Sequence, residues 1–426
     1  MKRYTYDPTQ DWQELLRRPA MDTQQLESIV SEVLEKVKTE GDTALKAYTA
    51  RFDGVQLDQL KATPAEIKAT HTQLDASLKK SIQLAKQNIQ TFHEKQQSSV
   101  EVVETMPGIK CWRKSVGIDK VGLYIPGGTA PLFSTILMLG VPAKIAGCQE
   151  IVLCTPPQKD GSIHPAILYT ADLVGVTQIF KVGGSQAVAA MAYGTESVPA
   201  VYKIFGPGNQ YVTAAKQLVN KEGTAIDMPA GPSEVLVCAD ESAEPAFVAA
   251  DLLSQAEHGV DSQVVLIAFS NAFVDAVQSA IQEQLAKLPR QSMAEKALDN
   301  SLSIVVESRT QALALINMYA PEHLILAVKE VHDFANQITN AGSVFMGNYT
   351  PESVGDYASG TNHTLPTNGF AKAYSGVSLD SFVKKITFQE LSKTGLENIA
   401  TAVEQMAAAE QLEAHRMAVA IRLGRS

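Results

Sequence analysis

Cysteine is scarce in this sequence. The 426 residues include only four cysteines, Cys111, Cys148, Cys154 and Cys238, and no Cys-x-x-Cys pair. So few thiols cannot form the disulfide framework of a small secreted domain, and their spacing does not match a thiolate zinc site. We therefore expect free, mostly buried thiols in a protein of the reducing cytoplasm.

Targeting segments, membrane spans and basic clusters are also missing. Residues 1–10 are polar and lack the apolar run of a signal peptide. The most apolar stretch, residues 130–148, contains Pro131, Pro142 and Lys144, which makes it a poor membrane span. Lys and Arg number 36 against 46 Asp and Glu, a net charge of −10. The sequence therefore predicts neither a membrane nor a nucleic acid as a partner.

The residues that are present indicate a globular protein of several domains. Hydrophobic residues make up 45% of the chain and charged residues 19%, and about 100–200 residues per domain is usual. Residues 24–37 and 65–92 have helical spacing, and residues 397–422 are expected to form one long helical region. From about residue 121, strand-like segments alternate with turns and helices, which predicts an α/β fold with parallel strands.

Three glycine-rich turns follow predicted strands and open predicted helices. They lie at residues 126–128, 183–186 and 206–209. Backbone N–H groups at helix N-termini bind phosphate, and such turns lie at the carboxyl ends of a parallel sheet. None of the turns matches GxGxxG or GxxxxGK[ST]. Tyr124, Gln186 and Asn209 lie at these turns, where they could contact a nucleotide, cap a helix or pack.

Two short motifs could carry chemistry. Gln255 and His258 are three residues apart near a predicted helix end, so they share a helical face. Histidine is a common metal ligand and glutamine an unusual one, but His258 could equally cap the helix. Glu322 and His323 follow Pro321 and could divide the work of activating water and accepting a proton. A solvated glutamate and a packed histidine remain the alternative.

Further candidates are scattered along the chain. Asp356 and His363 lie in the polar, glycine-bounded segment 355–363, which a surface turn would also explain. His415 follows Glu410 on the predicted terminal helix, where a surface residue is the ordinary interpretation. The chain has no HExxH signature. A metal site would have to be assembled from distant segments, so the residues themselves indicate a β/α enzyme that could use a nucleotide and a metal.

The chain resembles the histidinol dehydrogenase family. The matching segments are long, occur in the family's order and cover nearly the whole chain, most weakly over the first hundred residues and the last few. They are residues 121–149, 182–199, 204–216, 226–237, 251–264, 320–325 and 341–363. The missing GxGxxG motif fits a family whose nucleotide domain is only Rossmann-like.

The resemblance implies an activity and its central residues. Members oxidise L-histidinol to L-histidine through L-histidinal, at the end of histidine biosynthesis, with two NAD in succession and one zinc per subunit. The family's catalytic pair falls on Glu322, which would activate water, and His323, which would act as general base. The family's zinc ligands fall on Gln255, His258, Asp356 and His415.

The resemblance also implies binding residues and an assembly. The substrate contacts fall on Ser233, His363 and Glu410, together with the four zinc ligands and His323. The NAD contacts fall on Tyr124, Gln186 and Asn209. The family forms a homodimer with intertwined subunits, so Glu410 and His415 would reach the active site of the partner subunit.

The expected fold class is α/β, with two Rossmann-like parallel-sheet domains and helical extensions at both ends. Residues 1–24 would form the N-terminal extension. Residues 25–120 and 233–378 would form the first domain, with the catalytic and zinc-ligand segments. Residues 121–232 would form the second, NAD-binding domain, and residues 379–426 a helical tail that contributes to the partner's site.

Two other functions compete with this prediction. An aldehyde dehydrogenase with a cysteine nucleophile would need an activated thiol, but Cys148 and Cys154 lie in apolar segments with no adjacent base. A non-catalytic protein with two β/α lobes would bind a small amine without consuming NAD. Only the resemblance argues against this second alternative.

Overall fold

A computed structural model of the chain describes residues 1–19, 23–127, 130–229 and 231–425. The chain divides into two compact units. The first unit comprises Met1–Gln96 and Ile118–Phe382, and the second comprises Gln97–Gly117 and Val383–Ser426. The first unit contains two parallel sheets, and the second a small antiparallel sheet with two helices.

The larger sheet of the first unit is six-stranded, with the order β1-β11-β10-β9-β12-β13, and all its strand pairs are parallel. The strands are β1 (Lys2–Thr5), β9 (Glu234–Ala239), β10 (Gln263–Ala268), β11 (Leu302–Val305), β12 (His323–Ala327) and β13 (Ser343–Met346). Apart from β1 at the edge, the strands run 3-2-1-4-5 in chain order, which is the Rossmann order without its sixth strand.

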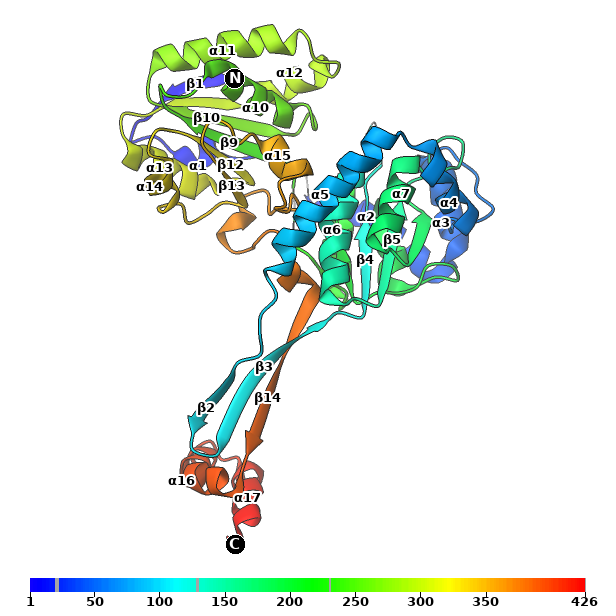
Figure 1. Ribbon diagram of the computed structural model, residues 1–426, viewed down its shortest axis with the longest axis vertical. Helices are drawn as coiled ribbons and strands as arrows, with labels where there is room; N and C mark the ends of the chain where they lie inside the picture. Colours follow the sequence, from blue (N-terminus) through cyan, green and yellow to red (C-terminus); the bar gives the residue numbers. More distant parts are fainter. Residues whose placement is uncertain (20–22, 128–129, 230, 426) are drawn as a thin grey trace. The chain divides into compact units, whose positions relative to one another are not determined.

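Helices cover both faces of this sheet (Figure 1). One face carries α10 (Pro245–Ala256), α11 (Asn271–Leu285) and α12 (Gln291–Asp299), and the other carries α1 (Trp12–Leu15), α13 (Arg309–Tyr319) and α14 (Val331–Ala335). Successive strand residues point to opposite faces, so Val235 and Val237 of β9 pack with the first group and Leu236 and Cys238 with the second. A sheet buried on both faces explains the continuous apolar runs in its strands.

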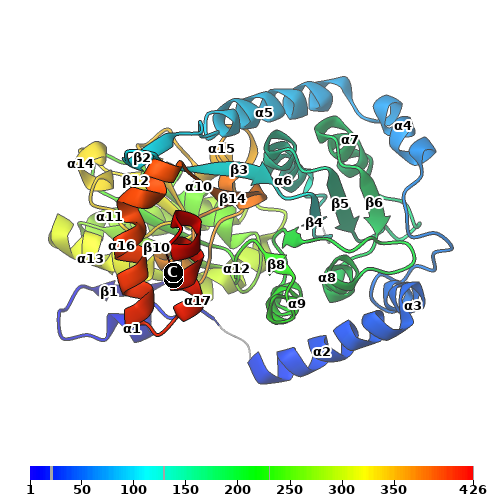
Figure 2. The ribbon, with the colours of Figure 1, turned by 90° about the horizontal axis from the view of Figure 1, so that it is seen from below.

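The second sheet is five-stranded and also fully parallel, with the order β6-β5-β4-β7-β8. Its strands are β4 (Lys120–Tyr124), β5 (Glu150–Thr155), β6 (Gln178–Lys181), β7 (Lys203–Phe205) and β8 (Ala225–Ile226). One face carries α5 (Ala76–Glu94), α6 (Phe133–Ala146) and α7 (Pro165–Val174). The other carries α2 (Thr23–Glu40), α3 (Asp42–Phe52), α8 (Gly184–Tyr193) and α9 (Gln210–Lys221), as Figure 2 shows. These strands again run 3-2-1-4-5.

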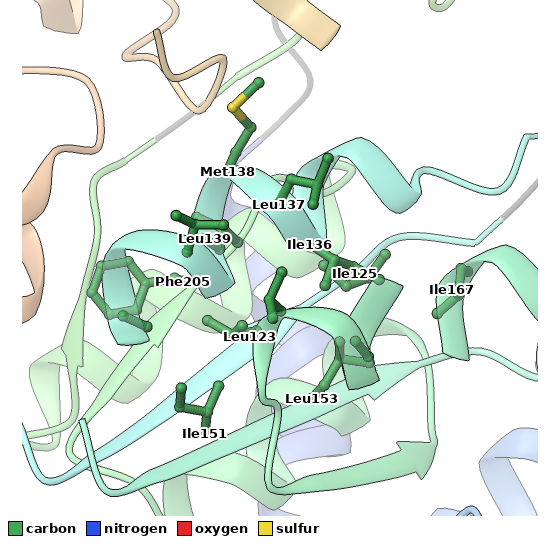
Figure 3. Close-up of a cluster of buried hydrophobic side chains, with 14 of the residues drawn as sticks. Leu123, Ile125, Ile136, Leu137, Met138, Leu139, Ile151, Leu153, Ile167 and Phe205 are labelled. Carbon is green, nitrogen blue, oxygen red and sulfur yellow. The ribbon is translucent and has the colours of Figure 1, made fainter. Parts of the chain in front are cut away.

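The most apolar stretch of the sequence is the buried helix α6. Ile136, Leu137, Met138 and Leu139 are all buried, and they pack with Leu123 and other residues of β4 and β5 (Figure 3). A helix that is apolar on every side is stable only when its surroundings are apolar too. No helix in the described ranges is long and apolar enough to span a membrane.

The expected fold class, α/β with two Rossmann-like parallel sheets, is confirmed. The expected domain boundaries differ from the structure, because the helices of residues 25–96 pack against the second sheet and not the first. The apolar stripe of α2, including Val30 and Val33, contacts α8 and α9. Helix α4 (Pro64–Gln73) packs against α7. Residues 2–5 form an edge strand and not a separate extension.

The second unit combines two distant segments of the chain. Strands β2 (Val102–Met106), β3 (Ile109–Gly117) and β14 (Val383–Leu391) form an antiparallel sheet. The predicted long helix over residues 397–422 is wrong. The chain forms α16 (Lys393–Ala409) and α17 (Glu413–Ala420), separated at Gln411, whose φ of 59° is not helical. Short 3-10 turns occur at Ile421–Leu423 in this unit and at Phe370–Lys372 and Leu379–Phe382 in the first unit.

Candidate active site and nucleotide pocket

Glu322 and His323 lie at the amino end of β12, beside the start of β9. Both side chains are buried. The Glu322 backbone N–H donates to Glu234 Oε1 at 3.2 Å, and the Glu234 backbone N–H donates to Glu322 Oε2 at 2.9 Å. This reciprocal pair of hydrogen bonds between neighbouring strands holds the Glu322 carboxylate in one orientation.

Arg18 supports this arrangement from the other side of Glu234. Its Nε and Nη2 donate to the two carboxylate oxygens of Glu234 at 2.6 and 2.7 Å. The guanidinium lies 3.7 Å from the centre of the Tyr319 ring. Such a two-point ion pair neutralises Glu234, whose side chain is only 1% exposed. Neither Arg18 nor Glu234 was predicted from the sequence. The one available signal was a glutamate at the start of the apolar strand segment 234–239.

The hydrogen bonds of His323 assign its two ring nitrogens different roles. Nδ1 lies 3.2 Å from the backbone oxygen of Glu234. A carbonyl oxygen only accepts hydrogen bonds, so Nδ1 carries the proton in the neutral ring. Nε2 has no hydrogen-bond partner in the described ranges and lies 3.7 Å from Asp356 Oδ1. Nε2 is therefore the ring atom that can accept a proton from a substrate.

The charges around this histidine are mostly negative. Glu322 Oε2 and Glu352 Oε1 lie 3.5 and 3.8 Å from His323 Nδ1. Burial raises the pKa of Glu322 and the pKa of Glu352 to about 8. Burial also lowers the pKa of His323, but the carboxylates of Glu352, Glu322 and Asp356 outweigh it and raise that pKa well above its usual range. This cluster of buried carboxylates is suited to holding a cation, which would oppose the proton on His323 and so leave Nε2 able to accept one.

Ligand-type atoms gather beside the catalytic pair. Atoms of His258, Glu352 and Asp356 lie within 4.8 Å of one another. Both amide atoms of Gln255 and both carboxylate oxygens of Glu352 are buried, with no hydrogen-bond partner in the part of the chain described. An unsatisfied buried polar group costs about 1–3 kcal/mol, so these atoms are expected to bind a partner from outside the chain. Histidine nitrogen and carboxylate oxygen are usual zinc donors, so these residues fit a zinc ion.

Glu352 was not among the predicted ligands. It lies four residues before Asp356 on α15 (Glu352–Tyr357), and residues four apart share a helix face. This spacing was the signal that could have found it. Gln255 lies in the last turn of α10, and His258 follows the helix end at Ala256.

The remaining predicted substrate contacts in the first unit lie close to these residues in the chain or in space. Ser233 directly precedes Glu234 at the start of β9. His363 Nδ1 lies 2.8 Å from the backbone oxygen of Asp356, and its Nε2 lies 3.1 Å from Thr135 Oγ1 on α6. His363 therefore connects the metal-ligand segment to a helix of the second sheet.

Glu410 and His415 belong to the second compact unit. Glu410 follows the end of α16 and His415 lies on α17, and both side chains are exposed. Their contribution to an active site therefore stays a prediction.

A cavity of about 1210 Å³ lies at the carboxyl ends of β4 and β5. Tyr124, Gln186 and Asn209, the three predicted NAD contacts, all line it. The Tyr124 hydroxyl accepts a hydrogen bond from the Gly184 backbone N–H at 3.1 Å, and burial raises the pKa of Tyr124 to about 12. Asn209 caps α9 by accepting from the Val212 N–H at 3.2 Å.

The turn after β7 depends on glycine and on a buried ion pair. Gly206 has a φ of 130°, and a Cβ there would lie 2.1 Å from the Tyr124 backbone oxygen. Asp227 accepts from the Gly206 N–H at 2.8 Å, and Lys216 donates to the Gly206 carbonyl at 2.9 Å. Lys216 and Asp227 also pair directly in the interior. The buried pair of Lys216 and Asp227 therefore fixes the backbone of the turn at Gly206.

Two Rossmann-like sheets, one with a large cavity at the carboxyl ends of its strands and the other with a buried carboxylate–imidazole pair, indicate an α/β enzyme of the nucleotide-using oxidoreductase class. The family model described as histidinol dehydrogenase matches residues 16–423. The chain belongs to the histidinol dehydrogenase family, and it is therefore an enzyme of histidine biosynthesis and not a non-catalytic ligand-binding protein.

Individual members of this family are similar to the chain over nearly its whole length. Histidinol dehydrogenase of Bacteroides thetaiotaomicron is 61% identical over 423 residues, which cover 99% of each chain. That of Bacteroides fragilis is 59% identical over the same shares. The crystal structure of histidinol dehydrogenase from Elizabethkingia anophelis is 52% identical, with a TM-score of 0.97 over 100% of this chain and 98% of that one.

Proposed function

We propose that this enzyme oxidises L-histidinol to L-histidine through L-histidinal, using two NAD and one zinc per subunit, as a cytoplasmic homodimer. The observation that carries the proposal is the group of His258, Glu352 and Asp356 ligand atoms beside the unpartnered Nε2 of His323. An amino alcohol bound beside these three residues would present its hydroxyl to His323 Nε2.

In the first oxidation, His323 Nε2 takes the proton of the alcohol while the carbinol carbon loses a hydride. The hydrogen bond from Nδ1 to the Glu234 carbonyl keeps the ring oriented and stabilises the imidazolium that forms. Bound NAD would supply the hydride acceptor, and a zinc ion held by Gln255, His258 and Asp356 would supply Lewis acidity and positive charge among the surrounding carboxylates.

In the second oxidation, Glu322 takes a proton from a water molecule that adds to the aldehyde. Its raised pKa of about 8 supports this role, because a base with a pKa near the working pH accepts a proton readily. His323, after releasing its first proton to solvent, removes a proton from the hydrate while the second hydride leaves. One histidinol, one water and two NAD+ thus give histidine, two NADH and protons released to solvent. Burial of both side chains keeps the reactive aldehyde away from bulk solvent.

The proposed homodimer would bring Glu410 and His415 into the partner's active site. The second compact unit exposes apolar side chains on its helices, including Met406, Met417 and Ile421. Exposed apolar side chains gathered on one small unit support its burial against another chain.

A cysteine-based aldehyde dehydrogenase is disfavoured by the state of the thiols. Burial raises the pKa of Cys148 to about 11 and the pKa of Cys154 well above its usual range. A nucleophilic thiol needs the opposite shift, because the thiolate is the reactive form.

The test is to count the NADH formed per L-histidinol consumed, before and after chelation and after zinc is restored. We expect two NADH per substrate, lost on chelation and regained with zinc. One NADH would mean that the second oxidation fails and would point to the Glu322 step. No NADH from a folded, zinc-loaded enzyme would overturn the proposal.

A further inference from the structure

The cavity of the second sheet lacks an acidic residue at a position where dinucleotide-binding folds commonly have one. In a Rossmann sheet, an acidic residue after the second strand accepts hydrogen bonds from the adenosine ribose hydroxyls. Here the second strand in chain order, β5, ends at Thr155 and is followed by Pro156 and Pro157; the first acidic residue after it, Asp160, accepts from Ser162 and does not line the cavity. Among the described residues that line the cavity, the carboxylates are Glu32 and Asp53. Neither belongs to the sheet.

These two carboxylates differ in their surroundings. Glu32 lies on an exposed part of α2. Asp53, directly after α3, is partly buried, and its Oδ2 is shielded from solvent without a hydrogen-bond partner in the described chain. Burial raises the pKa of Asp53 to about 6. A shielded carboxylate oxygen at a cavity wall therefore needs a donor that the protein itself does not supply.

The chain places Asp53 on the side of the sheet where an adenosine half would lie. After Asp53 it passes the loop that follows β5, where Leu57 lies 3.2 Å from a Cβ built on Gly161. It then runs beside β6, where the Lys181 N–H donates to the Leu60 carbonyl at 2.7 Å. In a sheet of this order, the second and third strands lie under the adenosine half of a dinucleotide.

The opposite half of the cavity leads toward the catalytic residues. Ala130 and Pro131 line the cavity just before α6, and Thr135 of α6 contacts His363, which bonds to Asp356. A reacting nicotinamide would have to lie on this side. Asp53 is therefore at the end of the cavity that is remote from the chemistry.

We propose that Asp53 accepts the vicinal hydroxyls of the adenosine ribose and thereby selects NAD over NADP. The inference rests on the proposed use of NAD. One carboxylate can accept hydrogen bonds from both hydroxyls of a ribose, whereas a 2′-phosphate would lie against its negative charge. The same wall contains the exposed cations Arg51 and Lys159. Without Asp53, these cations would favour a 2′-phosphate, so the carboxylate decides the selectivity.

Binding measurements test this without relying on turnover. We would titrate NAD, 2′-deoxyadenosine NAD and NADP calorimetrically into the wild-type enzyme, Asp53→Asn and the control Glu32→Gln. The wild type should bind NAD about 10-fold or more tightly than the 2′-deoxy analogue, and NADP more weakly still. Asp53→Asn should bind NAD about 10- to 100-fold more weakly, bind the two unphosphorylated dinucleotides alike, and bind NADP more tightly than the wild type does. Glu32→Gln should keep the wild-type order.

Several results would overturn the inference. Equal binding of NAD and its 2′-deoxy analogue by the wild type would do so with no variant needed, even if Asp53→Asn failed to fold. Unchanged NAD affinity in a folded Asp53→Asn would also contradict it while leaving the proposed function intact. A wild type that binds no NAD would instead overturn the proposed cofactor, and this inference with it.

Discussion

The two parallel sheets of the first unit share one strand order but use opposite ends of their strands. In the sheet β6-β5-β4-β7-β8, the cavity lies where β4 and β5 end. In the sheet containing β9 and β12, Glu234 and His323 are the first residues of their strands. One topology therefore supports two sites of different chemistry.

The helices explain why each end suits its site. Helices α8 and α9 begin at the cavity, so their N–H groups and the positive ends of their dipoles face it, which favours an anionic pyrophosphate. Helices α10 and α13 end near Gln255 and Glu322, so the negative ends of their dipoles face the catalytic residues. That end of a helix favours a cation. Strand direction, through the helix ends that it places at each site, thus adds to the opposite charge preferences of two copies of the same fold.

The largest effect should come from removing the base His323. It belongs to the amino-end site, where β9 and β12 begin, and its removal leaves intact the carboxyl-end cavity, where β4 and β5 end. In His323→Asn, the amide can still donate to the Glu234 carbonyl, but the atom corresponding to Nε2 is lost. We expect kcat for histidinol to fall about 100- to 10,000-fold. Calorimetric NAD affinity should not change. A parallel loss of NAD affinity would mean that the two sites are not separable.

The second prediction separates the two oxidations at the amino-end site. Glu322→Gln keeps an oxygen that can accept from the Glu234 N–H but removes the base that activates water. Aldehyde oxidation should fall about 100-fold or more, and alcohol oxidation should fall less. Single-turnover NADH formation from histidinol and from histidinal measures the two steps. Equal losses would contradict the division of labour between Glu322 and His323.

The third prediction concerns the support beneath the amino-end site. Arg18→Ala leaves the Glu234 carboxylate buried without its cation, which is expected to destabilise the fold by about 3–5 kcal/mol. The matched control is Arg17→Ala, whose side chain is 71% exposed beside Glu14 and should contribute less than about 1 kcal/mol. Urea unfolding of both variants measures the difference. Similar midpoints would show that the Arg18 pair does not stabilise the site.

The smallest effect should appear at the carboxyl-end cavity as a dependence of stability on pH. A raised carboxyl pKa means that the folded state binds the proton more tightly than the unfolded state. Stability is therefore lost as the pH rises from the ordinary value of 3.8 to about 6. Asp53→Asn should be neutral near pH 3.5 and more stable than the wild type near pH 7. Because Asp53 is partly exposed, the gain should be about 1 kcal/mol. A variant that is less stable at pH 7 would contradict this sign.

Much of the comparison between the two sheets could be predicted from the sequence. Short apolar runs with glycine-rich turns predicted the parallel sheets, because strand period and turn chemistry are local properties. The pairing of Gln255 with His258 and of Glu322 with His323 was visible for the same reason. The resemblance supplied the ligand role of Asp356, which the structure brings close to His258 and His323.

Other features could not be predicted because they depend on contacts between distant segments. The stripe of α2 shows that one face is buried but not which sheet buries it, and it packs with α8 and α9. Arg18 and Glu234 are 216 residues apart, so nothing local links them. The interruption between α16 and α17 occurs at Gln411, a residue with no strong tendency to end a helix.

Most strands and helices of the two parallel sheets, and the adjacency of Glu322 and His323, could be predicted from the sequence, because they follow from periodicity and covalent order. Only the tertiary structure decided which nitrogen of His323 is free, which acids surround it and which carboxylate faces the nucleotide cavity. Each of those properties depends on the groups that packing brings within a few ångströms. Strand direction then sets which helix ends face each site, and their dipoles add to the charge of the side chains there.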